Sequence, residues 1–176
     1  MGLYINIRYA KRADLRSIAD IYDQAYDEVL SNPDFGDYLR LKRPDQKRIK
    51  KWAKGLYSEI RNGNVLFFVA EHGNKIVGFC FVKKKDIPDS EISHVGVLGI
   101  RIIADFRGKG FGKLLVKHAL EESRGKFDIV EVEIVDINSA SKSLFMKLGF
   151  KTWGVAPRYI KRGGRYIDLE YMYLKL

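Results

Sequence analysis

The sequence predicts an α/β fold of the α+β type, in which a mixed sheet carries helices on its faces. Three observations predict it. Hydrophobic periodicity alternates between strand and helix spacing in the order β-α-α-β-β-β-α-β-α-β-β. A hairpin signal lies in the middle of the chain and another near its end, which favours antiparallel pairs. Between them lies one strand–turn–helix–strand unit, and a mixed sheet with helices on its faces is the natural packing for this order.

The N-terminal third contains one expected strand and two expected helices. Residues 3–8 alternate loosely and are expected to form a strand. The segment that follows has apolar residues at helical spacing up to Val29, with Asp14 as the expected N-cap. Residues 31–38 are rich in turn formers, and a second helix is expected after Pro44.

The middle of the chain is strand-like. The runs 65–71 and 76–82 flank Gly73-Asn74, which is a hairpin signal. A further apolar run extends from 92 to 103 and contains Gly96 and Gly99. Glycine inside a strand indicates a bulge or a close approach by another part of the structure.

The C-terminal half carries the expected strand–turn–helix–strand unit and a closing hairpin. A helix should follow the glycine-rich turn at 108–112, and residues 129–135 should form a strand. A second helix is expected at 138–148, with Gly149 ending it. The tail predicts a strand at 150–160, a turn and a last strand at 166–174.

Length and composition limit the function classes. The 176 residues are expected to form a single domain, 1–176. The 32 Lys and Arg residues exceed the 22 Asp and Glu residues, and the net charge of +10 favours an anionic partner. One cysteine excludes an internal disulfide framework and predicts a cytoplasmic location. No secretory signal or long apolar run is present, so no membrane association is expected. The three histidines lack the spacing of metal ligands, so no metal is expected.

The most informative motif is the glycine turn Arg107-Gly-Lys-Gly-Phe-Gly-Lys113. Its glycines let the backbone turn tightly and bring N–H groups close to a ligand. The start of the next helix adds partial positive charge, and the cations add full charges, so the turn suits a pyrophosphate. A P-loop is excluded because Leu114 follows Lys113. The third glycine comes one residue early for a dinucleotide fingerprint, and two hairpin strands precede the turn.

These residues resemble the GCN5-related N-acetyltransferase (GNAT) family. The glycine turn matches the family's R/Q-x-x-G-x-G/A signature, with Ala104 in place of the usual proline of the lead-in. The segment from Asn138 to Phe150 is similar to the family's N-x-x-A-x-x-L-Y-x-x-x-G-F pattern. The resemblance covers residues 5–174. It implies the GNAT fold, with a mostly antiparallel central sheet of about six to seven strands.

The resemblance also implies acetyl-CoA as co-substrate and direct acetyl transfer to a primary amine. In the family the signature turn binds the pyrophosphate, and the pantetheine arm pairs with the splayed strand before it. The residues implied in cofactor binding are Ile102, Ile103, Arg107, Gly108, Lys109, Gly110, Phe111, Gly112, Lys113 and Asn138. A backbone N–H near Ile102 would polarise the carbonyl. For Asn138 a second role, as the N-cap of the following helix, stays open.

The proton-transfer groups depart from the family pattern. Phe145 occupies the usual position of the tyrosine acid, so Tyr159 or Tyr166 is the candidate acid unless the thiolate leaves unassisted. The family's strand glutamate falls near Gly96, which makes His94 the first candidate base. Glu91 and Glu133 are further candidates for the base.

The expected partner is an amine-bearing acceptor, either a small molecule or a protein amine. A second copy of the chain, forming a homodimer, is a candidate partner, and nucleic acid is not expected. An alternative from another class stays open: a basic nucleic-acid- or ribosome-associated module that uses the same fold without catalysis. The basic run between Arg40 and Lys54 is the feature that supports it.

Overall fold

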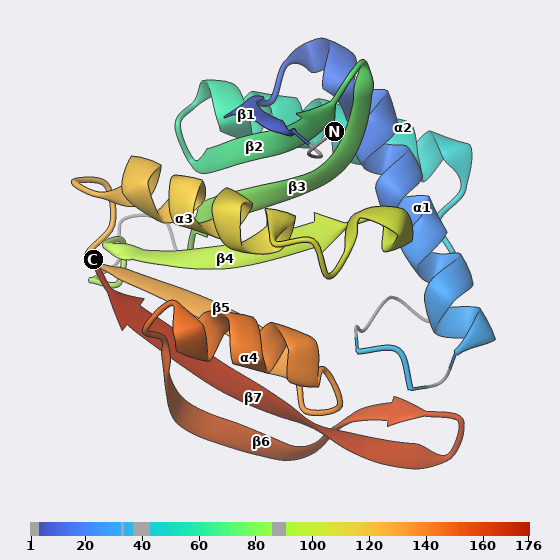
Figure 1. The fold of residues 1–176 in the computed structure, drawn as a ribbon, viewed down its shortest axis with the longest axis vertical. Coiled ribbons are helices and arrows are strands. Elements are labelled where there is room, and N and C mark those ends of the chain that lie inside the picture. The colour runs from blue at the N-terminus through green and yellow to red at the C-terminus, as the bar shows by residue number, and fades with distance from the viewer. Residues whose placement is uncertain (1–3, 33, 37–42, 86–90) are drawn as a thin grey trace.

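The computed structural model describes residues 4–32, 34–36, 43–85 and 91–176 (Figure 1). Its strands form one seven-stranded sheet in the order β1-β2-β3-β4-β5-β7-β6. Among the strands of the described residues, only β4 and β5 pair in parallel, and the other neighbours are antiparallel. The strands are β1 Asn6–Tyr9, β2 Val65–His72, β3 Lys75–Lys84, β4 Val95–Ile102, β5 Ile129–Val135, β6 Lys151–Arg162 and β7 Arg165–Lys175. The predicted fold class is confirmed.

Helices cover both faces of this sheet. They are α1 Leu15–Ser31, α2 Gln46–Arg61, α3 Phe111–Ser123 and α4 Ser139–Lys147, with 3₁₀ turns at Arg12–Asp14 and Ala104–Phe106. Figure 1 shows α3 and α4 in front of the sheet. On β3, Phe79 packs against Tyr22 of α1 with ring centroids 4.9 Å apart, whereas Phe68 of β2 packs against His118 of α3 at 5.0 Å. Phe67 joins Phe79 on the α1 side, so consecutive residues 67 and 68 reach opposite faces, as strand geometry requires.

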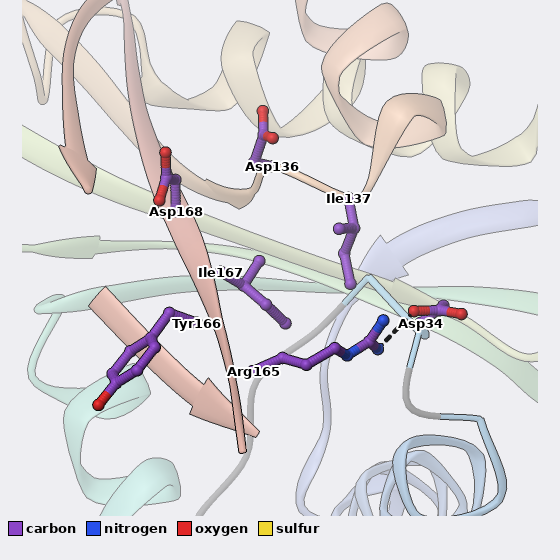
Figure 2. A pocket seen from close by; sticks show the side chains of 7 residues that line it. All are labelled: Asp34, Asp136, Ile137, Arg165, Tyr166, Ile167 and Asp168. Carbon is purple, nitrogen blue, oxygen red and sulfur yellow. Dashed lines mark hydrogen bonds and ion pairs between the residues drawn. The ribbon is translucent and has the colours of Figure 1, made fainter. Parts of the chain in front are cut away.

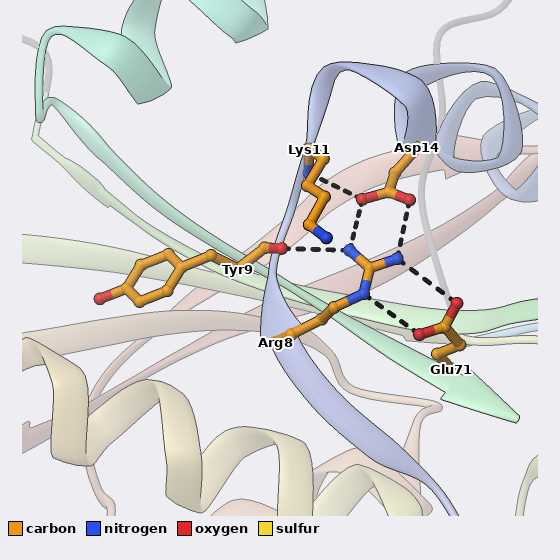
Figure 3. A network of polar contacts seen from close by, with 5 residues as sticks. All are labelled: Arg8, Tyr9, Lys11, Asp14 and Glu71. Carbon is orange, nitrogen blue, oxygen red and sulfur yellow. Dashed lines mark hydrogen bonds and ion pairs between the residues drawn. The ribbon is translucent and has the colours of Figure 1, made fainter.

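The residue expected to cap α1 binds elsewhere. Asp14 stands at the N-cap position, but its carboxylate makes no cap hydrogen bond to that helix. Instead it accepts hydrogen bonds from the Lys11 N–H at 2.7 Å and from both terminal nitrogens of Arg8 (Figure 3). Arg8 also bonds Glu71 on β2 through Nε at 3.1 Å. Through Arg8, this network links the start of α1 to the strands β1 and β2.

The Arg8 network predicts a loss of stability in acid. Burial alone would raise the pKa of Asp14, but the hydrogen bonds from Arg8 and Lys11 outweigh it and lower that pKa. A lowered carboxyl pKa stabilises the fold above the unfolded-state value near 4, and this stability disappears as the pH falls through the folded-state pKa. We expect Asp14→Asn to cost about 1.5–3 kcal/mol at pH 7 and much less near pH 3. Urea unfolding at both pH values measures this difference, and the exposed Asp20→Asn is the control. A cost that does not shrink in acid would contradict the assignment.

The glycines of β4 allow close packing and do not form a bulge. The β3–β4 register runs without a shift from Gly78 opposite Ile102 to Lys84 opposite Gly96. A Cβ at Gly99 would collide with the Phe81 ring, and one at Gly96 would lie 2.6 Å from Val82 Cγ1. The strand also begins at Val95, three residues later than predicted.

Candidate active site

The central feature of the site is the place where β4 and β5 separate. Their parallel pairing covers only Val95–Val97 of β4 and Ile129–Glu131 of β5. Beyond this point β4 stays paired with β3, and β5 stays paired with β7. The sheet therefore opens between two strands that are each held from the outer side. We call this opening the β4–β5 gap.

Hydrogen-bond register shows which backbone groups line the gap. Ile103 N–H donates to Val77 O at 3.0 Å, and Lys85 N–H to Val95 O at 3.0 Å. The odd-numbered residues of β4 therefore bond β3, and the even-numbered ones direct their N–H and C=O groups toward β5. The backbone of Leu98, Ile100 and Ile102 thus faces the gap. Ile102 lies where the resemblance implied, whereas the Ile103 N–H is committed to β3.

The glycine turn leads from the end of β4 into α3. Gly108 and Gly110 have φ values of 72° and 83°, and α3 begins at Phe111. A Cβ at Gly108 or Gly110 would meet nothing within 4 Å. Open space therefore adjoins the N–H groups at the start of a 13-residue helix, which is the arrangement that binds a pyrophosphate. The turn fits the phosphate groups of acetyl-CoA.

Two cations of the turn contact protein groups. Arg107 Nε donates to Ile102 O at 2.8 Å, and its Nη2 pairs with Glu28 Oε2 of α1 at 2.8 Å. Lys109 Nζ donates to Asp105 O at 2.6 Å. Arg107 thus occupies one carbonyl at the mouth of the β4–β5 gap and links the turn to α1.

Asn138 has the N-cap role that the sequence left open. Its Oδ1 accepts from Ser141 N–H at 3.0 Å at the start of α4, which confirms the cap. Its Nδ2 donates to Gly36 O at 2.6 Å. The chain at Gly36 lies so close that a Cβ there would collide with the Asn138 side chain. A contact between Asn138 and the cofactor stays a prediction.

The three predicted proton-transfer residues are dispersed. His94 is exposed and lies in the turn before β4, about 10 Å along the chain from Val97, on the paired side of the gap. Tyr166 lies near the β6–β7 hairpin, about 17 Å along β7 from Tyr171, with Arg158 over its ring at 4.2 Å. Tyr159 lies on β6 and is 62 % exposed. Their catalytic roles stay predictions.

Tyr166 and Asp168 line a small pocket beside the β6–β7 hairpin. It holds about 280 Å³, and Figure 2 shows its lining side chains, which are Asp34, Asp136, Ile137, Arg165, Tyr166, Ile167 and Asp168. Arg165 pairs with Asp34 across it at 2.6 Å, and Asp168 accepts from the Arg158 N–H at 2.7 Å. Asp168 therefore holds the backbone of β6.

Residues of four strands form two rows on the sheet face that carries α1 and α2, and the sequence patterns pointed to only two of them, Gly99 and Glu133. Strand register places two rows across the sheet there. The charged row consists of Lys83, Val97, Glu131 and Tyr173. The gap row consists of Phe81, Gly99, Glu133 and Tyr171, and the β4–β5 gap runs between Gly99 and Glu133. Only strand pairing reveals these rows, since their members come from four strands.

The fold and this site define an acyl-CoA-dependent acyltransferase. A splayed parallel pair directs backbone groups into the gap, and a glycine turn at a helix N-terminus follows it. The model of the Acetyltransferase (GNAT) family matches residues 16–150. The chain therefore belongs to the GNAT family.

Individual relatives agree with this assignment. The chain is 25% identical to the L-amino acid N-acetyltransferase AaaT of Escherichia coli over 173 residues, which cover 96% of each chain. It is 27% identical to the L-amino acid N-acyltransferase MnaT of the same organism, covering 98% of this chain and 94% of the relative. The yncA structure from Salmonella typhimurium, solved with its cofactor acetyl-CoA, shares the fold at a TM-score of 0.84 and 22% identity, covering 98% of this chain and 94% of that one.

The protein is an acetyl-CoA-dependent N-acetyltransferase that acts on an amine acceptor. The alternative of a nucleic-acid- or ribosome-associated module without catalysis is not favoured. In the described part of the chain, no helix is long and apolar enough to cross a bilayer. Within the same residues, no three His, Cys, Asp or Glu side chains form a group able to hold a metal ion.

Proposed function

We propose that this enzyme acetylates the α-amino group of small L-amino acids. The observation that carries the proposal is the mixture of charges beside the β4–β5 gap. Lys85 Nζ lies 2.5 Å from Glu131 Oε2 at the charged row, and Lys83 belongs to the same row. Glu133 follows one row further on. A free amino acid carries one group of each sign, so cations and carboxylates at this spacing suit it.

The remaining surface of this region suits a compact acceptor. The helices α1 and α2 pack on β3 and β2, and further across the sheet β5 and β6 carry the exposed side chains of Glu133 and Trp153. Phe81 and Tyr171 stand at the two sides of the gap row and offer aromatic surface to an acceptor side chain. The relatives AaaT and MnaT, both named as L-amino acid enzymes, support the same substrate class.

We further propose how the donor binds. The N–H groups of the turn 107–113 bind its pyrophosphate, and the gap-facing backbone of Leu98 and Ile100, together with the Ile102 N–H, pairs with its pantetheine arm. One of these N–H groups polarises the thioester carbonyl, and bound acetyl-CoA supplies the activated acetyl group. A cytoplasmic location, a single domain and a homodimer stay predictions.

The test is an amine panel with thiol release as the readout. We expect L-amino acids to be acetylated with at least about tenfold higher kcat/KM than their amides or the corresponding decarboxylated amines, because only they carry the carboxylate. Peptides, polyamines and aminoglycosides complete the panel. Equal turnover of an amino acid and its amide would contradict the proposal.

Lysine variants locate the carboxylate site. Lys83→Met and Lys85→Met are expected to raise KM for amino acids roughly 10- to 100-fold, since hydrogen bonds to charged groups contribute about 1.5–3 kcal/mol. The KM for acetyl-CoA should not change. Lys84→Met is the matched control, because the intervening residue of the strand directs its side chain to the opposite face. If Lys84→Met raises the KM for amino acids as much as the other two variants do, Lys83 and Lys85 do not bind the substrate carboxylate.

A further inference from the structure

A buried carboxylate of the sheet binds α4. Glu170 of β7 is only 3 % exposed, and a glutamate is rarely buried to this extent unless it is paired. Both of its carboxylate oxygens have partners, because Lys142 Nζ lies 2.6 Å from Oε2 and Thr152 Oγ1 donates to Oε1. Burial alone would raise the pKa of Glu170, but the hydrogen bonds from Lys142 and Thr152 outweigh it and lower that pKa. The carboxylate is therefore ionised at neutral pH.

The ion pair joins three elements on the α4 side of the sheet. Glu170 belongs to β7, Thr152 to β6 and Lys142 to α4. In the β5–β7 register Glu170 stands opposite Ile134, which is part of the main core. Figure 1 shows α4 in front of these strands. The carboxylate thus fixes α4 over β5 and β7, the strands on one side of the β4–β5 gap.

The turn of α4 that Lys142 anchors is the turn that holds Asn138. The Lys142 N–H donates to Asn138 O at 3.1 Å, and the Asn138 N–H donates to Val135 O at the end of β5 at 2.7 Å. The Asn138 side chain caps the same turn through the Ser141 N–H. The Lys142 side chain and the Asn138 side chain are therefore carried by one hydrogen-bonded turn.

The helix α4 also reaches the glycine turn. A Cβ at Gly112 would lie 3.7 Å from Leu144 Cδ2 of α4 and 3.7 Å from Ile100 Cδ1 of β4. A donor bound as proposed leaves the turn at this point and enters the gap beside Ile100, with α4 as one wall of its path. A shift of α4 would move this wall and leave the N–H groups of the turn 107–113 in place, because those belong to the segment between β4 and α3.

We infer that Glu170 is a positioning residue for the pantetheine arm of acetyl-CoA: it holds Lys142, and through Lys142 it fixes α4 and Asn138 beside the β4–β5 gap. Glu170 acts through the helix and does not touch the cofactor. A buried ion pair contributes little net stability, because the desolvation of its charges offsets their attraction. The effect of this pair is therefore on where the helix lies. This inference rests on the proposed mode of donor binding.

The experiment compares two ligands by calorimetry. One is acetyl-CoA, and the other is ADP phosphorylated on its ribose, which is the nucleotide half of coenzyme A without the pantetheine arm. Glu170→Gln removes the charge and keeps the shape of the side chain. We expect this variant to raise the Kd for acetyl-CoA roughly 2- to 30-fold, the range of effects that act through a packed element. The Kd for the nucleotide half should not change.

Variants of α4 test the other end of the pair, each measured well below its own melting temperature. Lys142→Met should show the same loss for acetyl-CoA alone, and the double variant with Glu170→Gln should lose no more than the weaker single variant, because the two residues act as one unit. Lys142→Arg should keep most of the affinity, since a guanidinium also pairs with a carboxylate. Lys147→Met is the matched control, because it removes an exposed lysine from the last turn of the same helix. It should bind both ligands as the wild type does.

The two ligands separate positioning of the arm from a general structural role. An equal loss of affinity for both ligands in Glu170→Gln would overturn the inference, and so would wild-type affinity for acetyl-CoA in that variant. If the wild type binds acetyl-CoA no more tightly than the nucleotide half, the arm has no site in the gap. In that case it is the proposed donor binding that fails.

Discussion

Replacing Gly110 with valine is expected to abolish acetyl-CoA binding while the protein stays folded. Gly110 has a φ of 83° and precedes the first residue of α3, and a Cβ there would enter open space beside the N–H groups of the turn. A bulky side chain in that space would exclude the pyrophosphate from those donors. We expect Kd, measured by calorimetry, to rise at least about 100-fold, since each lost hydrogen bond to a charged group contributes about 1.5–3 kcal/mol.

A matched variant separates this effect from backbone strain. Gly125 lies just beyond the other end of α3, has a φ of 76°, and also has open space around its Cβ position. Gly125→Val therefore carries a similar cost for a left-handed residue, about 1–2 kcal/mol, with no phosphate nearby. The two variants should melt at similar temperatures, and only Gly110→Val should lose the cofactor. Unchanged affinity in Gly110→Val would remove the pyrophosphate assignment.

Elements with strong local signals were predictable from the sequence. The strand 129–135 and the hairpin around Gly73 appear as predicted, because apolar runs and turn residues are local properties. The glycine turn could also be predicted, since three glycines and three cations within seven residues at the start of a helix are typical of a phosphate-binding turn. These segments carry the family assignment.

Contacts between distant segments were not predictable in the same way. His94 was expected on a strand, but the chain turns there, and β4 begins only at Val95. Aspartate is a common N-cap residue, which is why Asp14 was expected to cap the helix. The Arg8 guanidinium of β1, however, forms stronger hydrogen bonds with its carboxylate than the helix N–H groups would. Gly99 indicated a close approach, but only the register identifies Phe81 as the neighbour. Each outcome depends on strand pairing, which periodicity does not report.

Phe145→Ala is expected to produce the largest loss of stability among these variants. Phe145 occupies the position at which the family pattern has tyrosine, and its exposed fraction is 1 %. From α4 its ring points into the main core, where it packs edge-on against Phe150 with ring centroids 5.0 Å apart. Truncation removes this contact and leaves a cavity, and we expect a cost of about 3–5 kcal/mol in the free energy of unfolding.

The control for Phe145→Ala is the next residue of the same helix. Met146 is 59 % exposed, so Met146→Ala should change the free energy of unfolding by no more than about 0.5 kcal/mol. Urea unfolding followed by circular dichroism measures both variants. Because Phe145 anchors α4, and α4 begins at Asn138 beside Gly36, its truncation should also weaken acetyl-CoA binding if Asn138 contacts the cofactor arm. A Phe145→Ala protein as stable as Met146→Ala would show that this ring stabilises neither the helix nor the site.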